Sequence, residues 1–261
     1  MPRTTLALTS FVSGEFSAKM DGRTDFEKYS SGVKTMENFL VHPQGAATRR
    51  IGTQFISEVK SSAAKTRLIP FEFSTTQTYI LEFGNTYIRF FKDKGQILSG
   101  GSAYEISSPY LTAELFDIKF AQSADVMYIT HPNHEVMKLS RTGHTSWTLA
   151  QVDFTDGPYL ATNTTATTLT PAQAATGSNI NITASAVTGI NGGAGFQTTD
   201  VGRIISFNSG KAKITARTNT TVVVCTITTA FTNTNATAGF NLGAFSDTTG
   251  HPSCVSFFEQ R

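Results

Sequence analysis

Short apolar runs separated by tight-turn residues constrain the fold of this chain more than any other feature of its sequence. Six runs are rich in β-branched or aromatic residues, and they occupy residues 67–73, 78–83, 87–91, 201–207, 211–216 and 222–228. Gly, Asn, Ser and Asp in the gaps favour tight turns. We therefore expect a mainly β protein, with an antiparallel meander in the first half and a small β-barrel or sandwich in the second.

The meander offers two finer predictions. Within residues 78–83 the apolar and polar side chains alternate imperfectly, because Ile80 falls among the polar positions. Both faces of the sheet should then be partly covered. After the third run, Asp93-Lys94-Gly95 offers a tight turn in which Gly95 would supply the positive φ.

Helix content should be low. The longest candidate spans Asp25–Asn38, where Tyr29, Val33 and Met36 recur at helical spacing although Gly32 weakens the pattern.

Residues 114–123 follow Thr112, a candidate N-cap, and predict one or two helical turns before a strand over residues 126–130. At the far end, residues 253–261 indicate the opening of another buried strand. We expect either that the chain is truncated there or that another polypeptide completes this strand.

Charge divides the chain near Gly157-Pro158. Residues 161–250 carry only four basic and two acidic side chains and hold 23 threonines, whereas residues 1–160 carry 16 basic and 16 acidic side chains. A chain of 261 residues can form two ordinary domains. We predict a β-rich domain over residues 1–157, a Thr-rich β module over 158–246, and the start of a further strand region over 247–261.

Several function classes are disfavoured by composition. A formal net charge of +2 gives no broad basic surface for nucleic acid. Cys225 and Cys254 have neither disulfide-framework nor zinc-site spacing. The sequence has no signal-peptide pattern and no apolar run long enough for a membrane span, so we expect a soluble protein made in the cytoplasm.

Two histidines are candidate metal ligands. His131 and His134 are three residues apart beside Glu135, but Pro132 prevents a regular helix from holding both on one face. The spacing therefore favours a turn, and we predict no metal site and no cofactor.

Catalytic patterns are weak. Asp153 with Asp156, or Asp21 with Asp25, could supply a glycosidase carboxylate pair, but the sequence does not place either pair across a cleft. GxSxG and GxxxxGK[ST] patterns are absent. We expect no enzyme activity.

The basic pair Arg49-Arg50 has two interpretations. It follows the Pro43–Gly45 turn and could contact a phosphate or an acidic neighbour. A local ion pair is equally compatible with the sequence, and the candidate carboxylates are Glu15, Asp21 and Asp25.

Ordered sequence blocks carry a family resemblance. The blocks are Phe11–Ser17, Gly22–Tyr29, Met36–Gly45, Thr48–Thr53, Arg67–Phe73, Tyr79–Gly84, Phe120–Asp125 and Lys138–Leu149. Together they are spread over nearly the whole range of residues 10–160, and their order is more specific than any one block. In this order they resemble the nozzle or tail tubular proteins of short-tailed bacteriophages and their relatives.

A second resemblance concerns residues 158–245. They are similar to a β module inserted in such phage proteins and named after the FCCH domain of ubiquitin-activating enzymes. The likeness implies a fold only, since no thioester-cysteine context or adenylation motif is present. From His251 onward the chain resembles the start of a further blade of the family's body.

The resemblance implies a propeller-like, β-rich body that forms a ring around the DNA exit channel of the virion tail. Its expected partners are copies of itself, the head-to-tail adaptor, other tail proteins and, in passing, phage DNA. The residues that carry the N-terminal pattern form a suspected assembly motif. They are Gly14, Glu15, Ser17, Arg23, Asp25, Tyr29, Asn38, Pro43, Gly45, Arg49, Arg50 and Gly52.

A different class of function stays open from the sequence. Trp147, Tyr159 and the Thr- and Asn-rich surface could bind sugars, which would make the protein a tail-associated glycan-binding adhesin. Trp147 lies in a predicted strand, where a core position is the alternative.

Overall fold

The computed structural model describes residues 7–258, and over this range the chain forms β-strands, turns and short 3₁₀ helices. The chain divides into two compact units, one ending at Phe55 and the other beginning at Ile56. No helix in the described range is long and apolar enough to cross a membrane. A mainly β fold with little helix is therefore confirmed.

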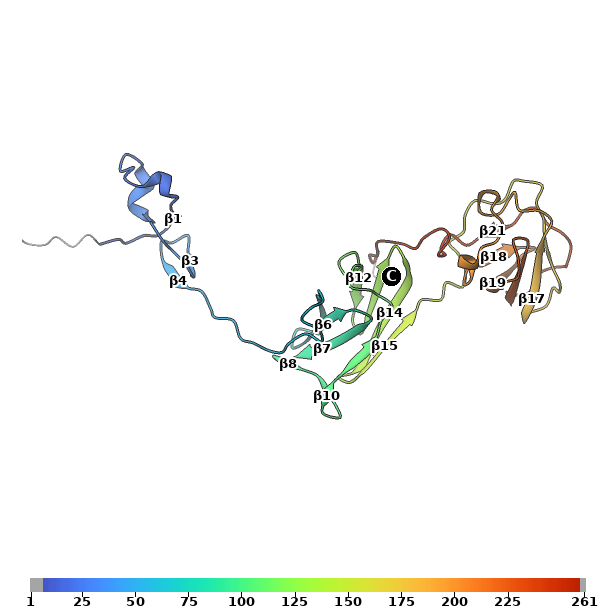
Figure 1. Ribbon diagram of the computed structural model, residues 1–261, viewed down its shortest axis with the longest axis horizontal. Helices are drawn as coiled ribbons and strands as arrows, with labels where there is room; N and C mark the ends of the chain where they lie inside the picture. The colour runs from blue at the N-terminus through green and yellow to red at the C-terminus, as the bar shows by residue number, and fades with distance from the viewer. Residues whose placement is uncertain (1–6, 259–261) are drawn as a thin grey trace, which may run out of the picture. The chain divides into compact units, whose positions relative to one another are not determined.

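The first unit is built from short elements (Figure 1). They are β1 (Gly14–Glu15), η1 (Ala18–Met20), η2 (Glu27–Ser31), β2 (Gly32–Val33), β3 (Phe39–Val41) and β4 (Ala47–Arg49). The helix predicted over residues 25–38 is wrong. Gly32 packs so closely on the Phe16 ring that an added Cβ would lie 2.1 Å from a ring carbon. The chain is therefore extended at this point, and β2 pairs with β1 in parallel.

Two antiparallel sheets follow in the second unit. The first has the order β11-β7-β6-β5, with β8 beside β7, and the second has the order β12-β13-β14-β15. Their strands are β5 (Arg67–Ser74), β6 (Gln77–Gly84), β7 (Tyr87–Lys92), β8 (Gly95–Gln96), β11 (Glu105–Ser107), β12 (Lys119–Ser123), β13 (Val126–His131), β14 (His134–Gly143) and β15 (Ser146–Gln151). A small hairpin, β9 (Leu98–Ser99) with β10 (Ser102–Ala103), lies between β8 and β11.

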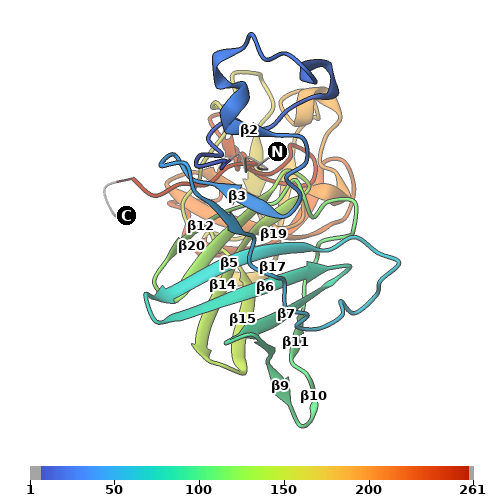
Figure 2. The same cartoon turned by 90° about the vertical axis from the view of Figure 1, so that its left-hand side faces the viewer.

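One hydrophobic core joins these two sheets. It contains Phe71, Leu81 and Phe90 from the first sheet and Met127 and Trp147 from the second, all at most 5% exposed. Figure 2 shows the turquoise β5–β7 strands crossing the green β14 and β15 strands. The meander predicted over residues 67–91 is confirmed, because β6 pairs in antiparallel with both β5 and β7.

The other face of the first sheet is partly covered, as the imperfect alternation predicted. Glu82 points away from the core, yet it is only 1% exposed. The Tyr87 hydroxyl donates a hydrogen bond to Glu82 Oε1, and the Lys60 amide approaches the same oxygen at 3.4 Å. Residues before β5 therefore close part of this face.

The turn between β7 and β8 differs from its prediction. Asp93 and Lys94 take the positive φ values, 51° and 60°, and Gly95 is the first residue of β8. Two consecutive residues with positive φ are typical of the type I′ turn, whose twist suits a two-residue hairpin. The turn lies where the sequence predicts it, but Asp93 and Lys94, rather than Gly95, have the positive φ values.

The helical turns predicted over residues 114–123 are wrong. Residues 114–117 form non-helical turns, and residues 119–123 form strand β12. Leu115 and Ile118 are fully buried in the core, whereas Phe116 is 59% exposed. Lys119–Ser123 pairs with β13 along its whole length. Sheet pairing therefore overrides the local helical pattern.

The second half of this unit is a six-stranded antiparallel sheet. Its order is β16-β17-β20-β19-β18-β21. The strands are β16 (Leu169–Pro171), β17 (Gly177–Ala184), β18 (Ile204–Phe207), β19 (Gly210–Arg217), β20 (Val222–Thr229) and β21 (Asn241–Leu242), and η3 (Asn191–Gly193) and η4 (Thr198–Asp200) precede β18. Its buried core draws on residues 169–242 and shares no residue with the first core.

The described C-terminal residues form no strand. Residues 253–258 have no strand partner, and Phe258 is 77% exposed. Residues 253–258 therefore form no strand within this chain, and completion of the strand by another polypeptide stays a prediction. The last three residues of the predicted strand, 259–261, lie outside the described part of the chain.

Candidate functional site

The suspected assembly motif does not converge on one binding site. Several of its residues shape turns: Gly14, Asn38 and Gly45 have φ values of 64°, 61° and 101°. The Gly45 carbonyl accepts a hydrogen bond of 2.8 Å from the Phe11 amide. These residues set the backbone path of the first unit, which is a structural role.

Five other motif residues make local polar contacts. Glu15 Oε2 accepts from the Met36 amide at 2.8 Å, and Ser17 Oγ accepts from the Lys19 amide at 3.2 Å. The Tyr29 hydroxyl accepts from the Gly22 amide at 3.1 Å. Arg23 forms a two-pronged ion pair with Asp25, with N–O distances of 2.8 and 2.7 Å.

The remaining motif residues, Pro43, Arg49, Arg50 and Gly52, are exposed. Within residues 7–258, Arg49 and Arg50 form no ion pair, so the expected local pairs with Glu15, Asp21 or Asp25 are wrong. Asp21 instead pairs with Lys34 at 3.1 Å. Both guanidinium groups are available to an acidic group outside the described chain.

The first unit lacks a hydrophobic core. Among its described residues, 7–55, Gly45 alone is buried. Eight large apolar side chains of this unit are exposed. Five of them, exposed by 37 to 88%, lie in β3 or shortly after β4, on both faces of this hairpin and beyond it, and we call them the N-terminal apolar surface: Phe39, Leu40, Val41, Ile51 and Phe55. Sequence reasoning missed this surface, although the unbroken apolar run over residues 39–41 was a signal for it.

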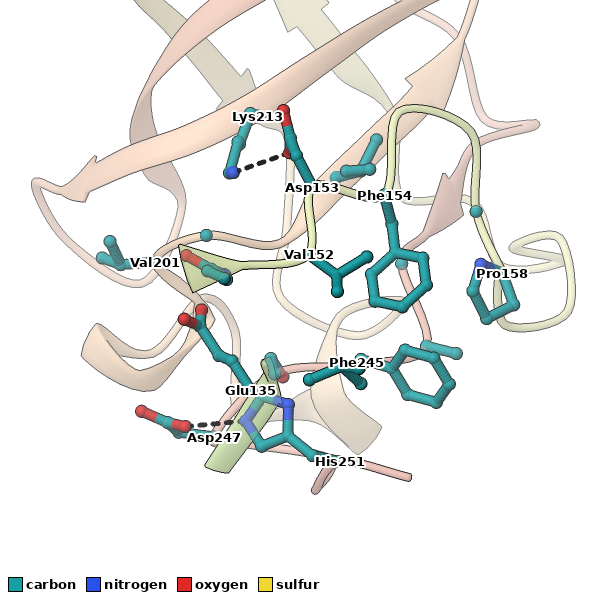
Figure 3. A pocket seen from close by; sticks show the side chains of 18 residues that line it. Glu135, Val152, Asp153, Phe154, Pro158, Val201, Lys213, Phe245, Asp247 and His251 are labelled. Carbon is teal, nitrogen blue, oxygen red and sulfur yellow. Dashed lines mark hydrogen bonds and ion pairs between the residues drawn. The ribbon is translucent and has the colours of Figure 1, made fainter. Parts of the chain in front are cut away.

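A pocket lies beside the chain that connects β15 to the six-stranded sheet (Figure 3). Two ion pairs line it: Lys213 with Asp153 at 3.1 Å, and His251 with Asp247 at 2.9 Å. Its cavity measures about 60 Å³. Small-molecule sites usually measure about 300–1,000 Å³, so this pocket has room for water rather than for a substrate.

A larger cavity of about 220 Å³ lies in the six-stranded half. Its wall is formed mainly by Leu160, Phe240 and Leu242 with two glycines, and the polar Asn163 and Asn191 also line it. Both amides already donate hydrogen bonds within the fold. Its lining includes one hydroxyl, that of Thr249, which donates to the Ala244 carbonyl, and it contains no acidic or basic side chain.

The carboxylates considered for glycoside hydrolysis are each held by a cation. Asp153 pairs with Lys213, and Asp156 pairs with Lys211 at 2.7 Å. The hydrogen bond from Lys211 lowers the pKa of Asp156. A general acid needs a raised pKa, so Asp156 is unsuited to that role.

The two histidines lie directly opposite each other across a two-residue turn. His131 ends β13, His134 begins β14, and their Cα atoms are paired in register. Glu114, from the turn before β12, accepts a hydrogen bond of 2.7 Å from His134 Nε2. The predicted turn is present, but sequence reasoning did not connect Glu114 with it, because 17 or more residues separate them in the chain.

No model of a known protein family matches the chain, and a search of curated proteins finds no match.

The sugar-binding alternative loses its main residue. Trp147 is 5% exposed, packs on Phe90 with ring centroids 4.5 Å apart, and donates its indole hydrogen to the His144 carbonyl. Its ring is not available for stacking on a sugar.

Proposed function

We propose that this protein is a non-catalytic structural component of a bacteriophage tail, in the nozzle or tube region, whose copies form a ring around the DNA exit channel. The observation that carries the proposal is the N-terminal apolar surface, together with the missing core beneath it. Ordering a residue costs about 1–2 kcal/mol of backbone entropy. Burial within residues 7–55 does not offset that cost, so a contact from outside this unit is needed, and the proposal assigns that contact to another subunit.

The kind of assembly is inferred from the order of sequence blocks between residues 10 and 160. That order resembles tail nozzle proteins, whose copies surround a channel. The expected partners are copies of this chain, the head-to-tail adaptor and other tail proteins. A propeller-like body and an FCCH-like module, projecting as a contact for neighbouring rings or fibres, belong to the same proposal.

The charge balance supports a channel through which DNA slides. Only 15% of the residues are charged, and the formal net charge is +2. Lysine and arginine contacts to phosphates release counterions and drive tight binding. A lining with few cations would let the DNA pass without trapping it.

Electron microscopy of labelled phage particles tests the location. An antibody raised against the six-stranded half should place gold particles on the tail, close to the head. Label on peripheral fibres would contradict the nozzle role and revive an adhesin. Absence of label, with the chain also absent from the particle's proteins by mass spectrometry, would remove the virion role altogether.

A further inference from the structure

Three side chains of metal-binding type converge in the first half of the second unit. Glu114 comes from the turn between β11 and β12, and His131 and His134 come from the ends of β13 and β14. One ligand atom from each lies within 4.8 Å of the other two. Glu114 and His134 are partly exposed, so an ion in solution can reach the cluster.

The hairpin explains why the two imidazoles meet. A two-residue turn places its flanking residues opposite each other, with both side chains on one face of the sheet. The ring centroids of His131 and His134 are accordingly 5.0 Å apart. Neighbouring Glu135 points to the other face and lines the pocket of Figure 3.

An unpartnered buried group points independently to a ligand. His131 is 1% exposed, and its Nε2 atom has no hydrogen-bond partner within the described chain. The hydroxyl of Tyr110, whose ring centroid lies 5.2 Å from that of His134, is also buried without a partner. Buried polar atoms are normally satisfied, so two orphans beside a carboxylate and two imidazoles are unusual.

We propose that Glu114, His131 and His134 bind one zinc ion. Two imidazoles and one carboxylate are an established zinc ligand set, which leaves a fourth position for water. Tetrahedral ligands at about 2.1 Å from zinc lie about 3.4 Å from one another. Glu114 and His134, now 2.7 Å apart, must therefore separate slightly, while any ligand pair near the 4.8 Å limit must close by about 1.4 Å. The ion would take the place of the proton that His134 Nε2 donates to Glu114, and in the neutral ring this proton moves to Nδ1.

Coordination requires one local change at His131. Its Nδ1 atom accepts a hydrogen bond of 3.1 Å from the Asn133 amide, so the neutral ring carries its proton on Nε2. Binding zinc through Nε2 moves that proton to Nδ1 and breaks this bond. Asn133 is exposed in the turn, where water can replace the lost acceptor.

The zinc ion would hold the segment that connects the two sheets in place. Residues 108–118 cross from β11 to β12, and the Arg67 guanidinium already holds this crossing by donating to the Leu115 and Ile118 carbonyls at 2.8 and 2.7 Å. A bond from Glu114 to the β13–β14 hairpin adds a second tie. The inference does not depend on the tail role proposed above.

Calorimetric titration of zinc chloride into the tag-free, EDTA-treated full chain tests the site. We expect one equivalent to bind with micromolar or tighter affinity and to raise the melting temperature. Cobalt should give visible absorption bands without the near-ultraviolet thiolate band that a cysteine ligand would add. Absence of zinc binding at concentrations well above micromolar would overturn the proposal.

Matched variants locate the binding. Glu114→Gln and His134→Gln should each weaken zinc binding at least tenfold, whereas Glu135→Gln and His42→Gln should leave it unchanged. Glu114 and His134 are partly exposed, so both substitutions should be tolerated by the fold. Equal affinity in all four variants would show that zinc binds elsewhere and would refute this site.

Discussion

Arg203 is the largest fully buried side chain of the protein's described residues. It pairs with Asp200 at 2.9 Å, and the two side chains are 1% and 0% exposed. Removal of one partner leaves a buried, unpaired charge, which costs about 3–5 kcal/mol. Arg203→Met should therefore lower the free energy of unfolding by about that amount in urea denaturation.

An exposed ion pair serves as its control. Lys213 and Asp153 are 33% and 70% exposed, and exposed pairs contribute about 0–1 kcal/mol. Lys213→Met should change the free energy of unfolding by no more than that. Similar losses for Lys213→Met and Arg203→Met would contradict the account of the buried pair.

The two cysteines should differ sharply in reactivity. Burial raises the pKa of the Cys225 thiol to about 12, so this thiol stays protonated at pH 8. Cys254 is exposed. Iodoacetamide should modify Cys254 alone in the native protein and both cysteines in urea, as counted by mass spectrometry. Native modification of Cys225 in a Cys254→Ser variant would contradict this burial.

The cluster around the two histidines could be predicted only in part from the sequence. Pro132 was correctly taken to exclude a helix, but a spacing of three residues also fits a two-residue hairpin turn, which brings His131 and His134 together. Glu114 joins them only through packing of the 108–118 crossing. Such a contact depends on the whole fold and leaves no local pattern in the sequence.

Two glycines of one loop provide a test at the level of elements. Gly192 and Gly195 have φ values of 65° and 73°, so alanine costs about 1 kcal/mol at either position. A Cβ at Gly195 would also lie 2.5 Å from the Thr220 carbonyl oxygen, whereas nothing lies within 4 Å of one at Gly192. Gly195→Ala should therefore be clearly the more destabilising in thermal unfolding. Equal melting temperatures would contradict the close approach of these segments.

Strands were predictable where local signals and pairing agree. Residues 67–73, 78–83 and 222–228 combine β-branched or aromatic side chains with flanking turn residues, and all three are strands. The two predicted helices failed for a different reason. Around Gly32 the chain packs against Phe16, and residues 119–123 gain a full set of hydrogen bonds from β13, which local helical spacing does not reveal.

The assembly proposal makes its own prediction for the whole molecule. Leu40→Asp with Ile51→Asp should abolish self-association, because each apolar side chain loses about 1.5 kcal/mol or more of burial. The two losses together correspond to roughly a hundredfold in the association constant. Analytical ultracentrifugation should show oligomers for the natural chain and monomers for this variant.

A charge-matched control separates apolar contact from added charge. Thr53→Asp with Gln54→Asp introduces the same two charges at exposed polar positions of the same unit. This variant should assemble as the natural chain does. Equal loss of assembly in both double variants would show that charge, rather than the N-terminal apolar surface, controls association.

At the largest scale, the sequence indicated a β protein whose charge distribution changes near Gly157. The structure has separate hydrophobic cores on the two sides of that position. It also has a contact boundary at Phe55, which composition did not indicate. The first 55 residues resemble their neighbours in composition and differ only in burial, a property that appears once the chain is folded.

Cryo-electron microscopy of the intact phage particle tests the central claim most directly. We predict that density for this chain repeats around the tail axis below the head, with Phe39, Leu40 and Ile51 covered by a neighbouring subunit. Density confined to peripheral fibres, or a ring in which these side chains face solvent, would contradict the account.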